Sequence, residues 1–64
     1  MKARRLLAAL LRAGWVVTRQ KGSHRTLVKE GAGTLLFAFH DGEEVRPLLV
    51  AKVARHAGLK REDL

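Results

Sequence analysis

Two helix stop signals constrain the fold of this 64-residue chain more than any other feature of its sequence. Gly14-Trp15 and Gly58-Leu59 each place a glycine, which adopts the left-handed backbone readily, before an apolar residue that can fold back on the helix. One signal lies near each end of the chain. They therefore predict two short helices with a middle segment between them.

Each predicted helix carries an apolar stripe. The first helix is expected over residues 2–13, with Gly14 at the position that ends it and Trp15 packing back on Leu10. Its apolar positions recur every three or four residues at Ala3, Leu6, Leu7, Leu10 and Leu11. The second begins at Pro47, which suits a first helical turn. Its stripe is Leu49, Val50, Val53, Ala54 and Ala57. Residues 60–64 are expected to form a frayed extra turn.

The middle segment is typical of strands. Residues 15–21, 24–29 and 34–39 are rich in β-branched and apolar residues, and Gly22-Ser23 supplies a tight turn between the first two. The third run is the most apolar, so we expect it to be the best buried. Residues 40–46 form a polar connector to the second helix.

These elements predict an α+β fold of one domain, residues 1–64, in the order α-β-β-β-α. Because neither helix can bury its stripe alone and the sheet needs one covered face, both helices should pack on the same side of a three-stranded antiparallel sheet. The other face is left to solvent or a ligand. This is the architecture of double-stranded RNA-binding domains, whose RNA-reading motifs are absent here.

Composition limits the classes of function. The chain has 13 Lys and Arg against 6 Asp and Glu, a formal charge of +7, so a polyanion is the expected partner. It has no cysteine, and no apolar run approaches the ~20 residues of a membrane span. The opening residues resemble a signal peptide. However, Arg12 interrupts the apolar stretch and no small-x-small cleavage site follows, which favours a folded helix in a cytoplasmic protein.

The segment around His24 is the most informative for chemistry. Histidine titrates near neutrality and can accept or donate a proton. Nearby cations can hold a phosphate and stabilise charge on its oxygens. The candidate phosphate-handling residues are Arg19, Lys21, Ser23 and Arg25. Such a group can cleave RNA without a protein nucleophile, because the ribose 2′-OH attacks the adjacent phosphorus.

Other interpretations of these residues stay open. From spacing alone, a histidine near a hairpin turn is more often a solvated polar residue than a catalyst, and Ser23 suits either a turn residue or a phosphate ligand rather than a nucleophile. His40 suits a second acid/base group, a loop residue or a partner contact, and His56 in the last turn of the second helix complements the helix dipole. The carboxylates of the connector have no matching acids elsewhere, so neither a metal site nor a cofactor is expected.

The arrangement of these motifs resembles the HicA toxin family of bacterial toxin–antitoxin systems. The resemblance rests on the Gly14-Trp15 step, the strand that leads to Gly22-Ser23-His24, and the closing Ala57-Gly58-Leu59. It covers essentially the whole chain. Family members carry Pro-x-His after the third strand and Gly-Thr-Leu at the second helix. Here the proline before His40 is missing and Arg46-Pro47-Leu48 replaces the second motif.

The resemblance implies a ribosome-independent mRNA interferase of a type II system, with His24 as the catalytic histidine and His40 aligned with a second one. It also implies an acidic HicB-like antitoxin that covers the active site, and contact with operator DNA only through the antitoxin complex. Two alternatives from other classes remain: a non-catalytic RNA-binding module of the same fold, and a basic protein-docking domain.

Overall fold

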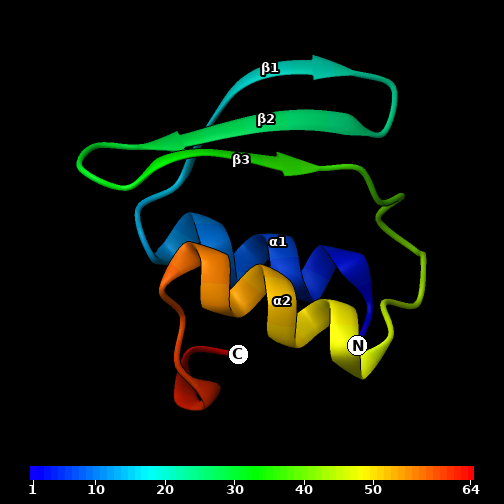
Figure 1. Cartoon of the computed structure of the whole chain (residues 1–64). Helices are drawn as coiled ribbons and strands as arrows, with labels where there is room; N and C mark the ends of the chain where they lie inside the picture. Colours follow the sequence, from blue (N-terminus) through cyan, green and yellow to red (C-terminus); the bar gives the residue numbers. More distant parts are fainter.

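The computed structural model describes residues 1–64 as α-β-β-β-α followed by a short final turn. The elements are α1 (Ala3–Arg12), β1 (Val16–Lys21), β2 (His24–Lys29), β3 (Gly33–Phe37), α2 (Pro47–Ala57) and the 3₁₀ turn η1 (Arg61–Asp63). Both helices lie against one face of the three-stranded sheet and leave the other face open (Figure 1). The predicted fold class and layer arrangement are confirmed. Neither helix has the length and apolar character that a bilayer crossing requires.

Both helices end as the stop signals predict. Gly14 adopts a φ of +102°, and the Trp15 N–H donates to the Leu10 carbonyl at 3.1 Å. The same bond closes α2, where the Leu59 N–H donates to the Ala54 carbonyl at 2.8 Å. These bonds satisfy carbonyls that would otherwise lack a partner at a helix end. They also turn the chain out of α1 toward the sheet, where β1 begins at Val16 (Figure 1).

Trp15 is the largest side chain of a small core. Only 12 of 64 residues are buried, so each large one carries much of the packing. Trp15 is 1% exposed, and its indole Nε1–H donates to the Ala57 carbonyl at the end of α2, 3.3 Å away. The other fully buried large side chains are Phe37, Leu6, Leu10, Leu27 and Val45. Phe39 packs edge-on against Phe37, with ring centres 5.2 Å apart.

The sheet is antiparallel in the order β1-β2-β3, so β2 is its central strand. The third strand, expected to be the best buried, contributes more fully buried residues than β2 or β1, but it is not buried throughout. Leu35 and Phe37 face the helices, but Leu36 between them is 74% exposed. The reason is that the helices cover only one face, so alternate side chains of an edge strand reach water. The strand also ends at Phe37, two residues earlier than expected.

Two residues of the predicted helical stripes also lie outside the core. Leu11 is 47% exposed and Leu49 is 39% exposed, whereas Ala9, which was not assigned to the stripe, is buried. Because each helical residue turns by about 100°, Leu11 and Ala9 flank the stripe on opposite sides. The final turn η1 lies on the Ala9 side. The Arg12 guanidinium donates to the Asp63 carbonyl at 3.2 Å, which holds that extra turn against α1.

The connector between β3 and α2, residues 38–46, is fixed to the start of α1. The Ala3 N–H donates to the Glu43 carbonyl at 2.9 Å, and the Arg4 N–H donates to the Asp41 carbonyl at 3.0 Å. The first N–H groups of a helix have no partner within the helix, so these bonds replace a side-chain cap. The connector therefore follows a defined path although it is polar and exposed.

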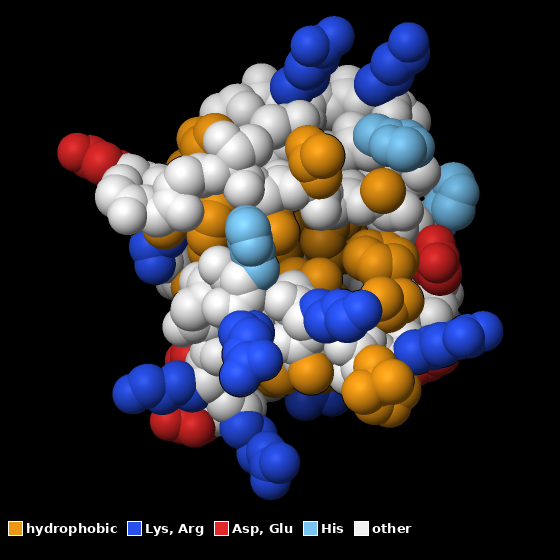
Figure 2. Space-filling model, viewed as in Figure 1, with side chains coloured by type: hydrophobic (Ala, Val, Ile, Leu, Met, Phe, Trp, Pro, Cys, Tyr) orange, Lys and Arg blue, Asp and Glu red, His pale blue; other side chains and the backbone are white.

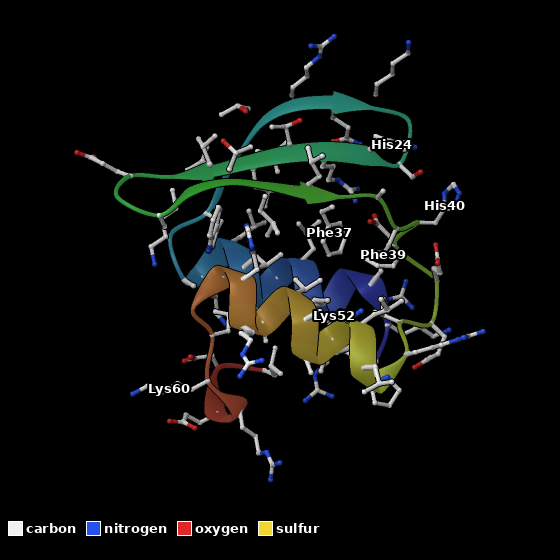
Figure 3. All side chains as sticks on the ribbon, in the orientation of Figure 1. His24, Phe37, Phe39, His40, Lys52 and Lys60 are labelled. Atoms are coloured by element: carbon white, nitrogen blue, oxygen red, sulfur yellow. The ribbon has the colours of Figure 1, made fainter.

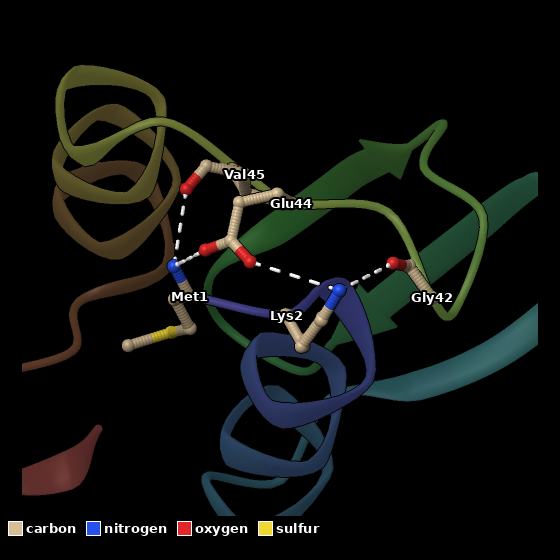
Figure 4. Close-up of polar contacts among 5 residues, drawn as sticks. All are labelled: Met1, Lys2, Gly42, Glu44 and Val45. Atoms are coloured by element: carbon tan, nitrogen blue, oxygen red, sulfur yellow. Dashed lines mark hydrogen bonds and ion pairs between the residues drawn. The ribbon is translucent and has the colours of Figure 1, made fainter.

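Charged groups reinforce this attachment (Figure 4). The Glu44 carboxylate accepts a hydrogen bond from the amino group of Met1 and lies 3.8 Å from the Lys2 Nζ. The same ammonium of Lys2 donates to the Gly42 carbonyl at 3.1 Å, and the amino group of Met1 donates to the Val45 carbonyl at 3.3 Å. The bond from the amino terminus, and then its positive charge, lower the pKa of Glu44 below its usual value near 4.5.

Glu44 should make stability depend on pH in the acid range. Because its pKa is lower in the folded protein, its stabilising effect is present above the unfolded-state pKa and is lost as pH falls through the folded-state value. We expect Glu44→Gln to lower Tm slightly at neutral pH and to match the wild type in strong acid. Thermal unfolding of both proteins across this range checks the prediction. A difference in Tm that persists in acid would contradict it.

Two substitutions of Trp15 should destabilise the fold to different extents. Trp15→Phe keeps an aromatic ring but leaves the Ala57 carbonyl without its donor, at a cost of about 1–3 kcal/mol. Trp15→Ala also removes most of the buried ring, at a cost of about 3–5 kcal/mol. Urea titration of both variants measures the two costs. Equal midpoints for Trp15→Phe and the wild type would show that the indole hydrogen bond contributes nothing.

Candidate functional site

The tight turn between β1 and β2 places His24 at the first position of the central strand. Lys21 and His24 form the last pair of the hairpin, and Gly22 and Ser23 make the turn. Gly22 adopts a φ of +60° and is followed by a residue with negative φ, the pattern of a type II′ turn. Open space surrounds Gly22, so its backbone conformation and not crowding requires glycine there. The His24 side chain is exposed at this corner (Figure 3).

A β-bulge decides which face the basic residues of β1 occupy. Val17 pairs with Leu27, but the next pair joins Arg19 to Thr26, so Thr18 is an extra residue in β1. Val17 packs against the core below the sheet. Strict alternation would turn Arg19 to that same side. The extra residue reverses the alternation, and Arg19 therefore reaches the open face.

Arg19, Lys21 and His24 share one polar hollow on the open face. The hollow has a volume of about 580 Å³ and no apolar side chain in its lining, which is completed by Gly22 and Thr26. Neither Arg19 nor Lys21 takes part in an ion pair. Figure 2 shows basic side chains standing out from this edge of the molecule, next to a histidine. The arrangement offers two unneutralised positive charges and an imidazole to the same anionic group.

The structure does not bring Arg25 to this group. Arg25 lies on the helix-facing side of β2, opposite Phe37, and its side chain is only 12% exposed. Its Nη2 donates to Asp41 Oδ1 at 2.9 Å, and its Nη1 is buried without a hydrogen-bond partner in the protein. In this position Arg25 joins β2 to the connector, which is in turn bound to the start of α1.

Ser23 and His40 lie near the hollow but do not line it. Ser23 is half-buried in the turn, and His40 is exposed just after β3. The backbone N–H of His40 donates to a Glu43 carboxylate oxygen at 3.1 Å. Because Arg25 beside His24 binds Asp41 beside His40, the two histidines lie at the same end of the sheet (Figure 3).

The net charge alone does not mark this site. Basic side chains also project from the helix side of the molecule, including Lys52 on α2 and Lys60 after it (Figure 3). What distinguishes the hollow is that its cations stand beside a histidine and no acidic residue lines it. No three His, Asp or Glu side chains come close enough together to hold a metal ion.

Two residues of the open face were not among the predicted site residues. Thr26 lines the hollow, and Leu36 lies directly opposite it on β3. Period-2 alternation from His24 would have found Thr26. Leu36 could be found only with the pairing register between β2 and β3, which the sequence does not specify.

The comparison with known families agrees with this geometry. A family model described as the HicA toxin of bacterial toxin–antitoxin systems matches residues 3–59 of the 64-residue chain. The chain belongs to the HicA toxin family. The match runs from the first residue of α1 to the Leu59 that closes α2, so it includes both helices, the whole sheet and the His24 corner.

HicA toxins are generally ribonucleases, and the family implies an antitoxin of the HicB type as the partner in the system. No curated protein matches the chain at a significant level. The family match supports the role of toxin for this chain.

Substitution of Arg25 should affect stability, unlike substitution of the exposed cations. Arg25→Gln removes a charge-assisted hydrogen bond to Asp41 and part of the packing under β2, which we expect to cost about 1–3 kcal/mol. Arg19→Gln is the matched control, because that side chain is exposed and unpaired, and it should change stability by less than about 0.5 kcal/mol. Thermal unfolding compares the two. Equal Tm values would contradict a structural role for Arg25.

Proposed function

We propose that this HicA toxin is an mRNA interferase, an RNA endonuclease that acts without the ribosome and without a metal ion. The observation that carries the proposal is the exposed imidazole of His24 beside two cations that no acid neutralises. A scissile phosphate bound between Arg19 and Lys21 would bring its neighbouring 2′-OH to the imidazole. Family membership supports an RNA substrate, because HicA toxins are generally ribonucleases.

The reaction needs no nucleophile from the protein. The ribose 2′-oxygen forms a bond to phosphorus while the bond from phosphorus to the 5′-oxygen breaks. The 2′-OH proton passes to a base, and the leaving 5′-oxygen takes a proton from an acid. His24 supplies one of these transfers, and a positioned histidine is worth about 10²- to 10⁴-fold in rate. The products are a 2′,3′-cyclic phosphate and a 5′-hydroxyl end.

Arg19 and Lys21 would act on the charge that develops during this step. The phosphate oxygens gather negative charge as the fifth bond to phosphorus forms, and fixed cations stabilise that state more than the starting phosphodiester. His40 is the candidate for the second proton transfer, because it lies exposed at the same end of the sheet. Ser23 is a candidate phosphate ligand from the turn. Arg25 contributes by holding β2 and the connector in place.

The open basic face also suits an acidic antitoxin of the HicB type. Such a partner would cover the His24 hollow and so prevent RNA from entering. Contact with operator DNA would then come through the antitoxin complex. Because the proposed substrate is mRNA, we place the reaction in the cytoplasm.

Cleavage of a defined single-stranded RNA in excess EDTA tests the proposal. We expect the wild type to cut the RNA, and His24→Ala to cut it at least about 100-fold more slowly while keeping its fold, because the side chain is exposed. His56→Ala is the matched control and should keep its activity. That histidine lies at the other end of the sheet, 3.2 Å from the Thr34 carbonyl.

Three results would contradict the mechanism. A folded His24→Ala protein with wild-type activity would remove His24 from the reaction. A 3′-hydroxyl product would indicate metal-dependent hydrolysis instead. Binding of the RNA without any strand scission, weakening steeply with salt, would identify a non-catalytic RNA-binding module.

A further inference from the structure

A second hollow lies on the other side of His24, between β2 and β3. Its volume is about 280 Å³, and its lining is His24, Arg25, Thr26, Leu36, Phe37 and Ala38. It shares His24 and Thr26 with the cationic hollow on the β1 side. The central strand therefore separates two hollows of different chemistry, with the exposed imidazole at their common border.

Polarity changes across the sheet in one direction. The pairing register aligns Arg19 on β1, Thr26 on β2 and Leu36 on β3 in a single row across the open face. Neighbouring strands lie about 4.8 Å apart, so the backbones of Arg19 and Leu36 are separated by about 10 Å. One end of the row attracts anions. The other end presents the Leu36 side chain, 74% exposed, to solvent.

A nucleotide has the same polarity. Its phosphate is anionic and strongly hydrated, whereas its base has broad faces that gain by contact with apolar groups. A phosphate at the leucine end would lose hydration, and Leu36 offers it no hydrogen bond or charge in return. A base has the opposite preference. An RNA nucleotide that lies across the row is therefore expected in one orientation only, with its phosphate toward β1 and its base toward β3.

We propose that Leu36 and the hollow beside it bind the nucleobase next to the scissile phosphate, which makes Leu36 a determinant of where the RNA is cut. This inference rests on the proposed function, because it takes the phosphate to lie in the Arg19–Lys21 hollow. It requires an unpaired base, since the edges and faces of a base are free to be splayed out only in single strands. The substrate is therefore single-stranded RNA.

Exposure alone does not single out Leu36. Leu48 is exposed to a similar extent, 78%, but it lies at the start of α2 beside Arg46, Pro47, Leu49 and Lys52, far from the hairpin turn in the sequence and on the helix layer. Leu36 is the exposed large apolar side chain that shares a hollow with His24, whereas Phe37, which also lines that hollow, is 1% exposed. The two leucines are thus a matched pair, equal in chemistry and exposure and different in position.

The test uses a short RNA whose cleavage position has first been mapped, and the same RNA with the base removed from one of the two nucleotides that flank that position. We expect the wild type to prefer the intact RNA over one abasic form by about fivefold to tenfold in kcat/KM, the lower end of what a base gains on an aromatic ring, because leucine is smaller and aliphatic. Leu36→Ser should lose this preference and keep its Tm. Leu48→Ser should behave as the wild type.

The possible results distinguish a failure of the Leu36 subsite from a failure of the proposed nuclease activity. If Leu36→Ser discriminates against the abasic RNA as well as the wild type does, the subsite is not at Leu36, although the nuclease stands. If Leu48→Ser loses the preference equally, the effect is not positional and the inference fails. If the wild-type protein leaves the intact RNA uncut, the proposed function itself fails.

Discussion

The indole of Trp15 is the contact on which the geometry of this small protein depends. The backbone N–H of Trp15 donates to the Leu10 carbonyl at the end of α1. Its indole N–H donates to the Ala57 carbonyl at the end of α2. The next residue begins β1. Three elements therefore take their relative positions from one buried residue. In a chain with so few buried side chains, such shared contacts replace the many separate ones of a larger core.

Charged residues have different roles on the two faces of the sheet. On the covered face, Arg25 binds Asp41, and that residue's carbonyl accepts from the first turn of α1, so the charge is used to attach elements. On the open face, Arg19 and Lys21 have no acidic partner. A cation that is already neutralised adds little to the binding of an anion, whereas an unpaired one keeps its full attraction. Pairing, more than the number of basic residues, distinguishes a binding surface from a structural one.

The sequence was sufficient for the elements whose signals are local. The glycine stop signals and Pro47 placed both helices within one residue, and Gly22-Ser23 placed the hairpin. Burial was harder, because it depends on what covers each side chain. Leu36 and Leu11 are as apolar as their buried neighbours, and only the position of the helix layer and of the final turn leaves them in water.

The site was predictable in composition but not in arrangement. Local sequence brought Arg19, Lys21 and His24 to one turn, and a seven-residue segment necessarily contains Arg25 as well. Sorting these residues between the two faces needs the pairing register. A bulge leaves no signature that can be read from β1 alone, since Thr18 is an ordinary strand residue.

The bulge at Thr18 determines which side of the sheet the residues after it in β1 face. Val17 must stay in the core and Arg19 must stay outside it, yet they are two residues apart, a spacing that a regular strand would direct to one side. Deleting the single residue Thr18 would make the two neighbours in a regular strand, where alternation places them on opposite sides without any bulge. Among chains of this architecture, a first strand one residue shorter would therefore keep its cationic outer surface, whereas a strand of the same length without the bulge would turn Arg19 toward the helices.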